Sequence, residues 1–219
     1  MKFLIILLAF VFLSGCSKNE QSVLQKEKKV LLRIASAYPT HIPMLGSNIV
    51  KIGQRIEEAG GDKIKIKLME PSDVGGMKDI LDTVSAGTID MGYSSAGFWS
   101  GKMPASPLFS SVPFGPEAGA YLAWMKHGNG LKLYQKMYDD AGYNVKVIPC
   151  CMLPPETSGW FAKEISSPED LQGIKKRFFG LGARVMEKLG VSTVLMGGGE
   201  IFQALDKGVI DATEFSMPS

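Results

Sequence analysis

Hydrophobic residues recur along the chain with two alternating periods, one typical of strands and one typical of helices. VLLRIAS (30–36) is a short apolar run, as in a buried strand, and KIKIKLM (63–69) alternates strictly, as a half-exposed strand does. Between them, MLGSNIVKIGQRIEEAGG (44–61) spaces its apolar residues as a helix does and ends on glycines. We therefore predict strand, helix and strand in this order, which is the signature of an α/β unit with a mainly parallel sheet.

The same alternation continues along the next part of the chain. GGMKDILDTVSAGTID (75–90) predicts a helix that stops at Gly87, and MGYSSAG (91–97) predicts a short strand. Two helices and a strand are expected after it, in GPEAGAYLAWMKHG (115–128), GLKLYQKMYDDAG (130–142) and YNVKVIPCCM (143–152).

A change of character at LPP (153–155) marks a lobe boundary, because two prolines force an extended path. We expect a first lobe over 30–153 and a second over 154–219. The second lobe is expected to hold strands in SGWFAKE (158–164), IKKRF (174–178), STVLM (192–196) and IDATEF (210–215), with helices in ARVMEKLG (183–190) and EIFQALDKG (200–208). It stops on a strand with no helix to cover it, so we expect the chain to be truncated at its C-terminus.

The first residues follow the pattern of a secretory signal. Lys2 precedes the apolar run FLIILLAFVFLSG (3–15), which is shorter than a membrane span. LSGC (13–16) resembles the lipobox of bacterial lipoproteins, in which the cysteine is acylated and becomes the mature N-terminus. We expect residues 1–15 to be a signal peptide, Cys16 to carry a membrane anchor and the polar residues 16–29 to be a tether. A plain secretory signal with an incidental cysteine is the alternative.

Charge and the spacing of cysteine and histidine give no sign of nucleic-acid binding, of a cysteine metal site or of a disulfide framework. Lysine and arginine total 24 and aspartate and glutamate 22, which gives a formal charge of +2. Beyond a short lysine cluster near the N-terminus, no basic stripe suggests a nucleic-acid footprint. Cys150 and Cys151 are adjacent, so they offer neither metal-ligand spacing nor a disulfide framework, and we expect both to be buried. His41 and His127 show no partner spacing and are expected at the surface.

Glycine-rich turns do not form a nucleotide site. Gly180 and Gly182 follow a strand and open a helix, but Val185 stands where the dinucleotide fingerprint has its third glycine. MGGGEIF (196–202) lacks the lysine and the serine or threonine of a P-loop, and it places Glu200 where a phosphate would bind. These glycines are better explained as tight turns between strand and helix.

Arg177 stands at the carboxyl end of a predicted parallel strand, where open α/β sheets hold their ligands. An arginine there can hold a carboxylate through two parallel hydrogen bonds, which a lysine cannot reproduce. The alternative is an ion pair with a local carboxylate such as Asp170. The residue pattern alone leaves both roles open.

Several motifs taken together resemble the extracytoplasmic solute-binding proteins of TRAP transporters. SGWFAKEISSPEDLQGIKKRFFGLGARVMEKLGVSTVLMGGGEIFQALDKGVIDATEF (158–215) follows that family's order of motifs, and TVSAGTIDMGYSSAGFWSGKMP (83–104) and FSSVPFG (109–115) match its first lobe. The resemblance spans about residues 31–219. It implies an α/β fold of the periplasmic-binding-protein type, with two lobes and mainly parallel sheets, incomplete here at the C-terminus. The two lobes would close on an organic acid.

The resemblance also implies a site. Arg177 matches the family arginine that grips the substrate carboxylate, and the chain is most similar to the binders of 2-oxo acids and lactate, in which a cation bridges protein and substrate. The implied cation ligands are Glu156, Glu214 and the main-chain carbonyl of Phe215. Phe98, Trp99 and Tyr38 align with cleft-lining aromatics, although each could equally be core. Trp160 and Phe161 lie on a strand that crosses between the lobes, and for them we expect core packing.

Two positions depart from the family. Relatives often carry glutamine where Glu156 stands and tryptophan where Phe215 stands. Phe215 keeps its main-chain oxygen and an apolar wall. Carboxylate and carbonyl oxygens suit hard cations, and the extra negative charge of Glu156 favours a divalent ion, so we expect calcium, with sodium as the fallback.

The expected function is capture of a small organic carboxylate in the periplasm and its delivery to the small and large membrane subunits of a TRAP transporter. A ligand sensor with the same fold is one alternative. A metal-dependent envelope enzyme that uses Glu156 and Glu214 is another, but no catalytic motif accompanies that pair. Pyruvate, lactate, longer 2-oxo acids and small dicarboxylates all remain candidate ligands.

Overall fold

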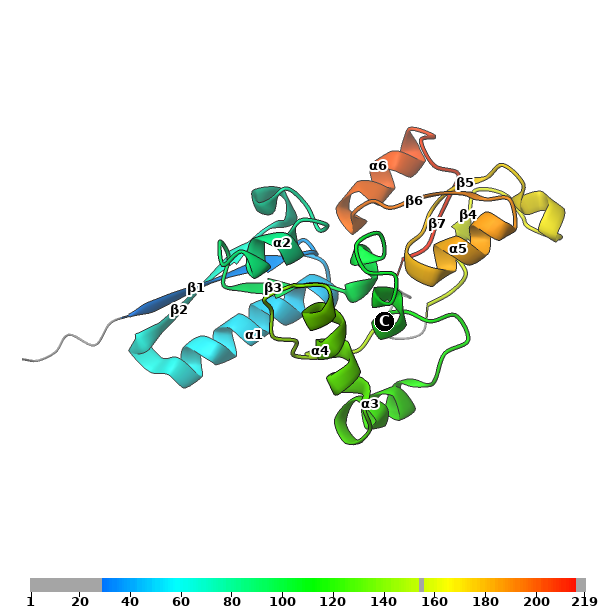
Figure 1. Cartoon of the computed structure of the whole chain (residues 1–219). Coiled ribbons are helices and arrows are strands. Elements are labelled where there is room, and N and C mark those ends of the chain that lie inside the picture. Colours follow the sequence, from blue (N-terminus) through cyan, green and yellow to red (C-terminus); the bar gives the residue numbers. More distant parts are fainter. Residues whose placement is uncertain (1–28, 154–155, 216–219) are drawn as a thin grey trace, which may run out of the picture.

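Two separate β-sheets organise the chain, one in each of two consecutive segments (Figure 1). The computed structural model describes residues 29–153 and 156–215. We call 30–153 lobe I and 156–215 lobe II. The expected signal peptide, the lipidated Cys16 and its tether up to residue 28 lie outside the described residues.

Lobe I contains a three-stranded parallel sheet in the order β2-β1-β3. Its strands are β1 (Val30–Ser36), β2 (Ile64–Met69) and β3 (Met91–Tyr93). Its α-helices are α1 (Leu45–Gly60), α2 (Ile80–Ser85), α3 (Ala118–His127) and α4 (Gly130–Asp140), with short 3₁₀ turns η1 (Gly61–Lys63), η2 (Pro71–Val74), η3 (Ala96–Trp99) and η4 (Ser106–Phe109).

Helices cover both faces of this sheet. Gly53 of α1 lies beside Ile66 and Leu68 of β2. Leu68 pairs with Ile34 of β1, and paired residues of parallel strands share a face, so α1 covers the face that carries Ile34. A parallel sheet needs such covering, and the apolar run of β1 reflects it.

The opposite face carries Ala35 and its partner Gly92. A Cβ atom on Gly92 would come within 2.6 Å of the Ile80 Cγ2 atom, so the missing side chain is what allows α2 to pack closely on β3. Figure 1 shows α1 and α2 on either side of the three strands.

Lobe II contains a four-stranded sheet in the order β4-β7-β5-β6, parallel except for the antiparallel pair of β4 and β7. Its strands are β4 (Trp160–Phe161), β5 (Lys175–Arg177), β6 (Ser192–Val194) and β7 (Ala212–Thr213). Its helical segments are α5 (Gly180–Lys188), α6 (Ile201–Asp206), η5 (Pro168–Leu171) and η6 (Gly198–Glu200). A small buried cluster of Leu171, Ile174, Val191 and Ala212 forms its own core.

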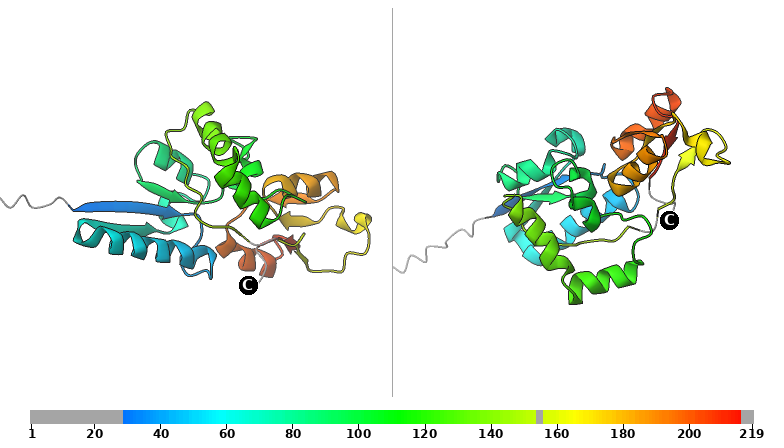
Figure 2. Two further views of the ribbon diagram at one scale, coloured as in Figure 1. Left: turned by 90° about the horizontal axis from the view of Figure 1, so that it is seen from below. Right: turned by 45° about the vertical axis from the view of Figure 1, so that its right-hand side comes forward.

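The two lobes touch along one edge, as the turned views show (Figure 2). Phe179 of lobe II packs its ring on Phe98 of lobe I, with ring centroids 5.5 Å apart. Phe179 belongs to the large core cluster of lobe I, and Leu195 and Phe215 of lobe II pack against that cluster. Both lobes therefore contribute apolar surface to a common interface.

Several local predictions are wrong. No strand forms in the described residues 143–153, where YNVKVIPCCM was expected to make one, because a strand requires a hydrogen-bonded neighbour and the structure provides none there. Cys150 and Cys151, expected to be buried, are exposed on this segment. Trp160, expected in the core, is 42 % exposed because β4 is an edge strand.

The expected surface position of His41 and His127 is confirmed. Among the described residues, no helix is both long and apolar enough to cross a bilayer.

The burial of Ile34 gives a test of the lobe I core. Ile34 is 1 % exposed at the middle of the sheet, so Ile34→Ala should lower the free energy of unfolding by about 2–5 kcal/mol through lost burial and a cavity. Urea denaturation followed by tryptophan fluorescence measures the change. Leu31→Ala on the same strand is the control, since Leu31 is 56 % exposed and its loss should stay within about 0.5 kcal/mol. Equal losses in the two variants would contradict this description of the core.

Candidate functional site

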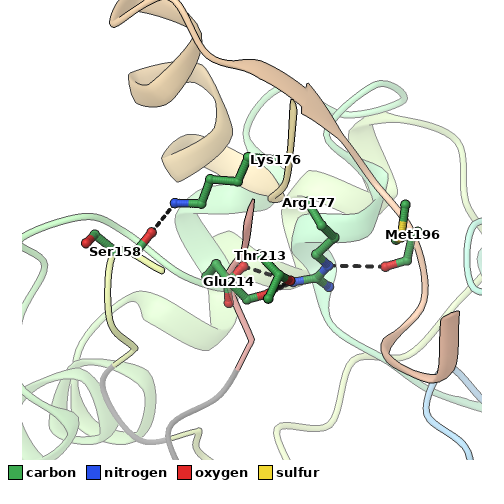
Figure 3. A network of polar contacts seen from close by, with 6 residues as sticks. All are labelled: Ser158, Lys176, Arg177, Met196, Thr213 and Glu214. Atoms are coloured by element: carbon green, nitrogen blue, oxygen red, sulfur yellow. Dashed lines mark hydrogen bonds and ion pairs between the residues drawn. The ribbon is translucent and has the colours of Figure 1, made fainter. Parts of the chain in front are cut away.

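A buried arginine stands at the centre of the lobe II sheet edge. Arg177 ends β5, which lies between β7 and β6, and its side chain is only 3 % exposed in the described structure. Its Nη1 atom donates to the main-chain oxygen of Glu214 at 2.7 Å and to the Glu214 Oε2 atom at 2.9 Å. Its Nε atom donates to the main-chain oxygen of Met196 at 3.2 Å (Figure 3). The guanidinium is thus held by the chain segments that follow both neighbouring strands.

The local alternative proposed from sequence, a pair of Arg177 with Asp170, does not form. The Asp170 carboxylate instead accepts hydrogen bonds from the main-chain nitrogens of Ser166 and Ser167 and caps η5. These bonds to the charged form lower the pKa of Asp170. The ion-pair partner of Arg177 is Glu214, which is 37 residues away in the sequence.

Aromatic rings flank the guanidinium. Its central carbon lies 5.5 Å from the ring centroid of Phe179 and 5.5 Å from that of Phe215. Within the described residues, Nε and Nη1 form the hydrogen bonds of the guanidinium and Nη2 forms none. In this part of the chain, one edge of the fork is therefore left for an anion beside apolar rings, where a hydrogen bond is less screened than in water.

Glu214 is the second buried charge. It is 1 % exposed, and its Oε1 atom is buried without a hydrogen-bond partner in the described part of the chain. Burial raises the pKa of Glu214 to about 8, against the opposing effect of Arg177, and the neighbouring carboxyl group of Glu156 raises it further. Glu156 therefore lies next to Glu214, although 58 residues separate them in the sequence, and the two carboxylates face one another beside the arginine.

This donor set fits a hard cation. A buried carboxylate oxygen without a partner is costly, and a metal ion between Glu156 and Glu214 would satisfy it. No group of three or more histidine, cysteine, aspartate or glutamate side chains clusters in the described residues, and main-chain oxygens, such as that of Phe215, and the bound molecule are available as further oxygen ligands. Oxygen ligands of this kind suit sodium or calcium rather than zinc.

Lobe I contributes Tyr38 and Phe98. Burial raises the pKa of the Tyr38 hydroxyl, and the charges of Cys151, Glu156 and Arg177 also act on it, which places Tyr38 close to the charged group. The Tyr38 ring packs on Phe98 at 5.9 Å between centroids. The site is therefore built from both lobes, with its charges on lobe II and neutral aromatic groups on lobe I.

Trp99 is the one site residue predicted from sequence that lies apart from this group. Its ring packs edge-on against Tyr138 at 6.1 Å in the lobe I core, and its indole nitrogen is buried without a partner among the described residues. The structure brings together Arg177, Glu156, Glu214, Phe215, Tyr38 and Phe98.

Sequence reasoning missed Phe179, and it placed Lys176 on the face of the strand opposite to Arg177 without predicting its burial. The Phe179 ring lies beside the Arg177 guanidinium. The one sequence signal for this contact is that Phe179 follows Arg177 by two residues, since alternate residues of an extended segment point to the same side. Lys176 is fully buried on the other side of the strand, where its ammonium group donates to the main-chain oxygen of Ser158. It lies 4.6 Å from the Phe161 ring centroid and 4.4 Å from that of Phe178. Alternation along β5 thus separates the two cations.

Two surface hollows of lobe II lie elsewhere. They measure about 320 Å³ and 510 Å³ and share Phe161 and Lys163 in their linings. Neither lining includes Arg177, Glu156 or Glu214, so these hollows are not part of the charged site.

Comparison with known proteins matches most of the chain to one family. Residues 36–219 match the model of the bacterial extracellular solute-binding proteins, family 7, also called DctP. The chain is 37 % identical over 208 residues to the monocarboxylate 2-oxoacid-binding periplasmic protein of Nostoc sp. strain PCC 7120. That alignment covers 94 % of this chain and 56 % of the Nostoc protein.

Solved structures agree with this match. A TRAP periplasmic solute-binding protein from Pseudoalteromonas atlantica, with bound sodium and pyruvate, superposes with a TM-score of 0.80 at 31 % identity over 86 % of this chain and 57 % of that one. One from Colwellia psychrerythraea, with bound calcium and pyruvate, gives the same TM-score, identity and coverage. The chain therefore spans about half the length of the relatives it matches.

The buried Lys176 predicts a pH dependence of stability. Burial lowers the pKa of Lys176 to about 8, below its value in the unfolded chain, so between about pH 8 and about pH 10 the unfolded state binds more protons. The Lys176 contribution to stability should then rise with pH across this window. Urea denaturation at several pH values should show a more positive slope for the wild type than for Lys176→Met. Lys188→Met is the control, because Lys188 is exposed on α5 and should leave the slope unchanged. A wild-type slope equal to that of Lys176→Met would refute the assignment.

Proposed function

The chain belongs to family 7 of the bacterial extracellular solute-binding proteins, and on that premise we propose that it captures a small 2-oxo or 2-hydroxy monocarboxylate together with a bound cation. This family serves transport by binding solutes and is not a family of enzymes. The proposal takes its ligand class from relatives that bind 2-oxo acids or pyruvate.

The observation that carries the proposal is the state of Arg177. A guanidinium on a side chain that is 3 % exposed needs compensation for its lost hydration, and Glu214 supplies only part of it. A carboxylate that approaches Nη2 between the rings of Phe179 and Phe215 would complete the compensation. Tyr38, which faces the same group from lobe I, would bring a hydroxyl to the ligand when the lobes close on it.

Charge balance favours a divalent cation. A cation bound between Glu156 and Glu214 would favour the ionised form of Glu214 against the effect of burial, so that the loaded site holds two carboxylate charges, one positive charge on Arg177 and one more negative charge on the monocarboxylate. The sum is −2, which calcium cancels and sodium leaves at −1. An uncompensated charge is costly in a buried site, so we propose calcium, with sodium as the weaker alternative. Relatives with glutamine in place of Glu156 would carry one charge less and need only a monovalent ion.

Location and partners complete the proposal. We propose that the protein works in the periplasm, is held at a membrane through a lipid on Cys16 and delivers its ligand to the small and large membrane subunits of a TRAP transporter. Support comes from the family and from the signal-like N-terminal sequence. Mass spectrometry of the purified N-terminus would test the anchor, since an unmodified Cys16 or an intact residue 1–15 segment contradicts it.

The arginine clamp can be tested by substitution. Arg177→Ala should weaken the binding of pyruvate by about 2–5 kcal/mol, because a bound carboxylate loses its buried partner. Isothermal titration calorimetry of the full-length protein measures the change. Arg177→Ala also leaves the buried Glu214 without its ion-pair partner. Arg177→Lys should therefore be measured beside it, with circular dichroism to verify folding. Lysine keeps the charge but loses the fork, so weaker binding is expected here too.

Arg184→Ala provides the matched control for the clamp. Arg184 lies on the exposed side of α5, seven residues from Arg177, and its loss should change the affinity by less than about 0.5 kcal/mol. A folded Arg177→Ala variant whose affinity for pyruvate changes by less than about 0.5 kcal/mol would remove Arg177 from the proposal.

The cation can be tested through Glu156. In the wild type, removal of divalent ions with a chelator should abolish tight pyruvate binding, and calcium should restore it better than sodium. Glu156→Gln removes one negative charge, so it should reverse this order and favour sodium. Calorimetry of pyruvate binding in the presence of each ion, together with the shift in melting temperature that each ion causes, provides two independent readouts.

Glu164→Gln is the control for the cation test. Glu164 is an exposed carboxylate of the same lobe, and its substitution should leave the order of the two ions unchanged. Affinity for pyruvate that is indifferent to divalent ions in the wild type would contradict the calcium proposal while leaving the arginine clamp intact.

A further inference from the structure

Phe179 occupies a fixed position between Arg177 and lobe I. The two residues are two apart on an extended segment, so their side chains leave the chain on the same side, and the Phe179 backbone is extended at φ −139° and ψ 167°. The ring stands 5.5 Å from the guanidinium carbon on one side and 5.5 Å from the Phe98 ring on the other. The ring therefore fills the space between the charged group and the facing lobe.

Gly97 lets the ring reach this position. A Cβ atom on Gly97 would stand 2.7 Å from the Phe179 Cε2 atom and 2.9 Å from the Ser110 Oγ atom. No side chain longer than hydrogen fits there, so the edge of the Phe179 ring rests directly on the main chain of η3.

The backbone around Phe179 is also constrained. Gly180 has φ +63°, in the left-handed region that favours glycine, and the main-chain oxygen of Phe179 accepts a hydrogen bond from the Ala183 nitrogen at the start of α5. The ring is 9 % exposed. It cannot move aside without a change in the first turn of α5 or in the contact between the lobes.

We propose that Phe179, seated on Gly97, is the residue that limits the chain length of the bound acid. This inference rests on the proposed function, in which the carboxylate of the ligand lies on Arg177. The Phe179 ring occupies the space between that anchor and the wall formed by Gly97 and Phe98. A short acid such as pyruvate stays on the Arg177 side of the ring, and an acid chain that extends toward Gly97 has to displace the ring.

Removal of the ring should convert this wall into space for a longer chain. In Phe179→Ala, the additional methylene groups of 2-oxohexanoate gain contact with the face of the Phe98 ring that the Phe179 ring covers in the wild type. Each methylene group that gains full burial strengthens binding about fourfold. The ratio of the dissociation constants of 2-oxohexanoate and pyruvate should therefore fall by about tenfold or more.

The experiment compares full-length wild type, Phe179→Ala, Phe179→Leu and Phe161→Ala by calorimetry with pyruvate and 2-oxohexanoate at one saturating calcium concentration. Phe179→Leu keeps an apolar side chain at the lobe interface and should shift the ratio in the same direction by a smaller factor, which keeps the test open if the alanine variant does not fold. Phe161→Ala is the matched control, because Phe161 packs against the separate lobe II core and should leave the ratio unchanged.

The outcomes are separable. If both acids weaken by equal factors in the Phe179 variants, Phe179 has only a structural role and the inference is overturned. If the wild type already binds 2-oxohexanoate as tightly as pyruvate, no wall limits the chain and the inference is likewise overturned. If the wild type binds neither acid with calcium or sodium, the proposed function itself has failed, which the wild-type titrations reveal before any variant is compared.

Discussion

The ion pair between Arg177 and Glu214 is the interaction on which the site depends. It joins the ends of two neighbouring central strands, β5 and β7, and both of its charges are almost wholly removed from water. A buried pair of this kind rarely adds stability over an apolar pair, because desolvation offsets the Coulomb attraction. The pair instead fixes the position and orientation of the guanidinium at the end of the sheet. It also leaves the Glu214 Oε1 atom without a hydrogen-bond partner among the described residues.

The electrostatic imbalance around that pair links ligand and cation. Glu156 adds a second carboxylate to a space that already holds Glu214, and its charge raises the pKa of Glu214 beyond the effect of burial. A cation and an organic anion entering together would resolve the imbalance, whereas either one alone would leave it partly uncompensated. This coupling needs no large movement of the chain, since the groups concerned already lie close to one another.

Sequence predicted the arrangement of elements well wherever local pattern decides it. β1 was predicted to the residue, and α1, α4 and β2 within a residue or two, because apolar spacing and terminal glycines act locally. The pattern failed for the segment 143–153, whose strand character depends on a neighbour, and for Cys150 and Cys151, whose exposure follows from that segment. The position of Arg177 at the end of a strand was predicted from the pattern, which left its role open until the resemblance was added. Only the resemblance could suggest its partner Glu214 and the nearby Glu156. Glu214 lies 37 positions from Arg177 and 58 positions from Glu156 in the sequence, and no periodicity connects residues so far apart.

The three hydrogen bonds that hold the Arg177 side chain also have a thermodynamic consequence. A long, flexible side chain usually loses rotational freedom when it grips a ligand, at a cost of about 0.5–1.5 kcal/mol. Here the chain has already frozen those torsions during folding, so the entropy is lost before any solute arrives. This loss of entropy lowers the free energy of unfolding. In return, the Arg177 side chain is already ordered when the ligand binds.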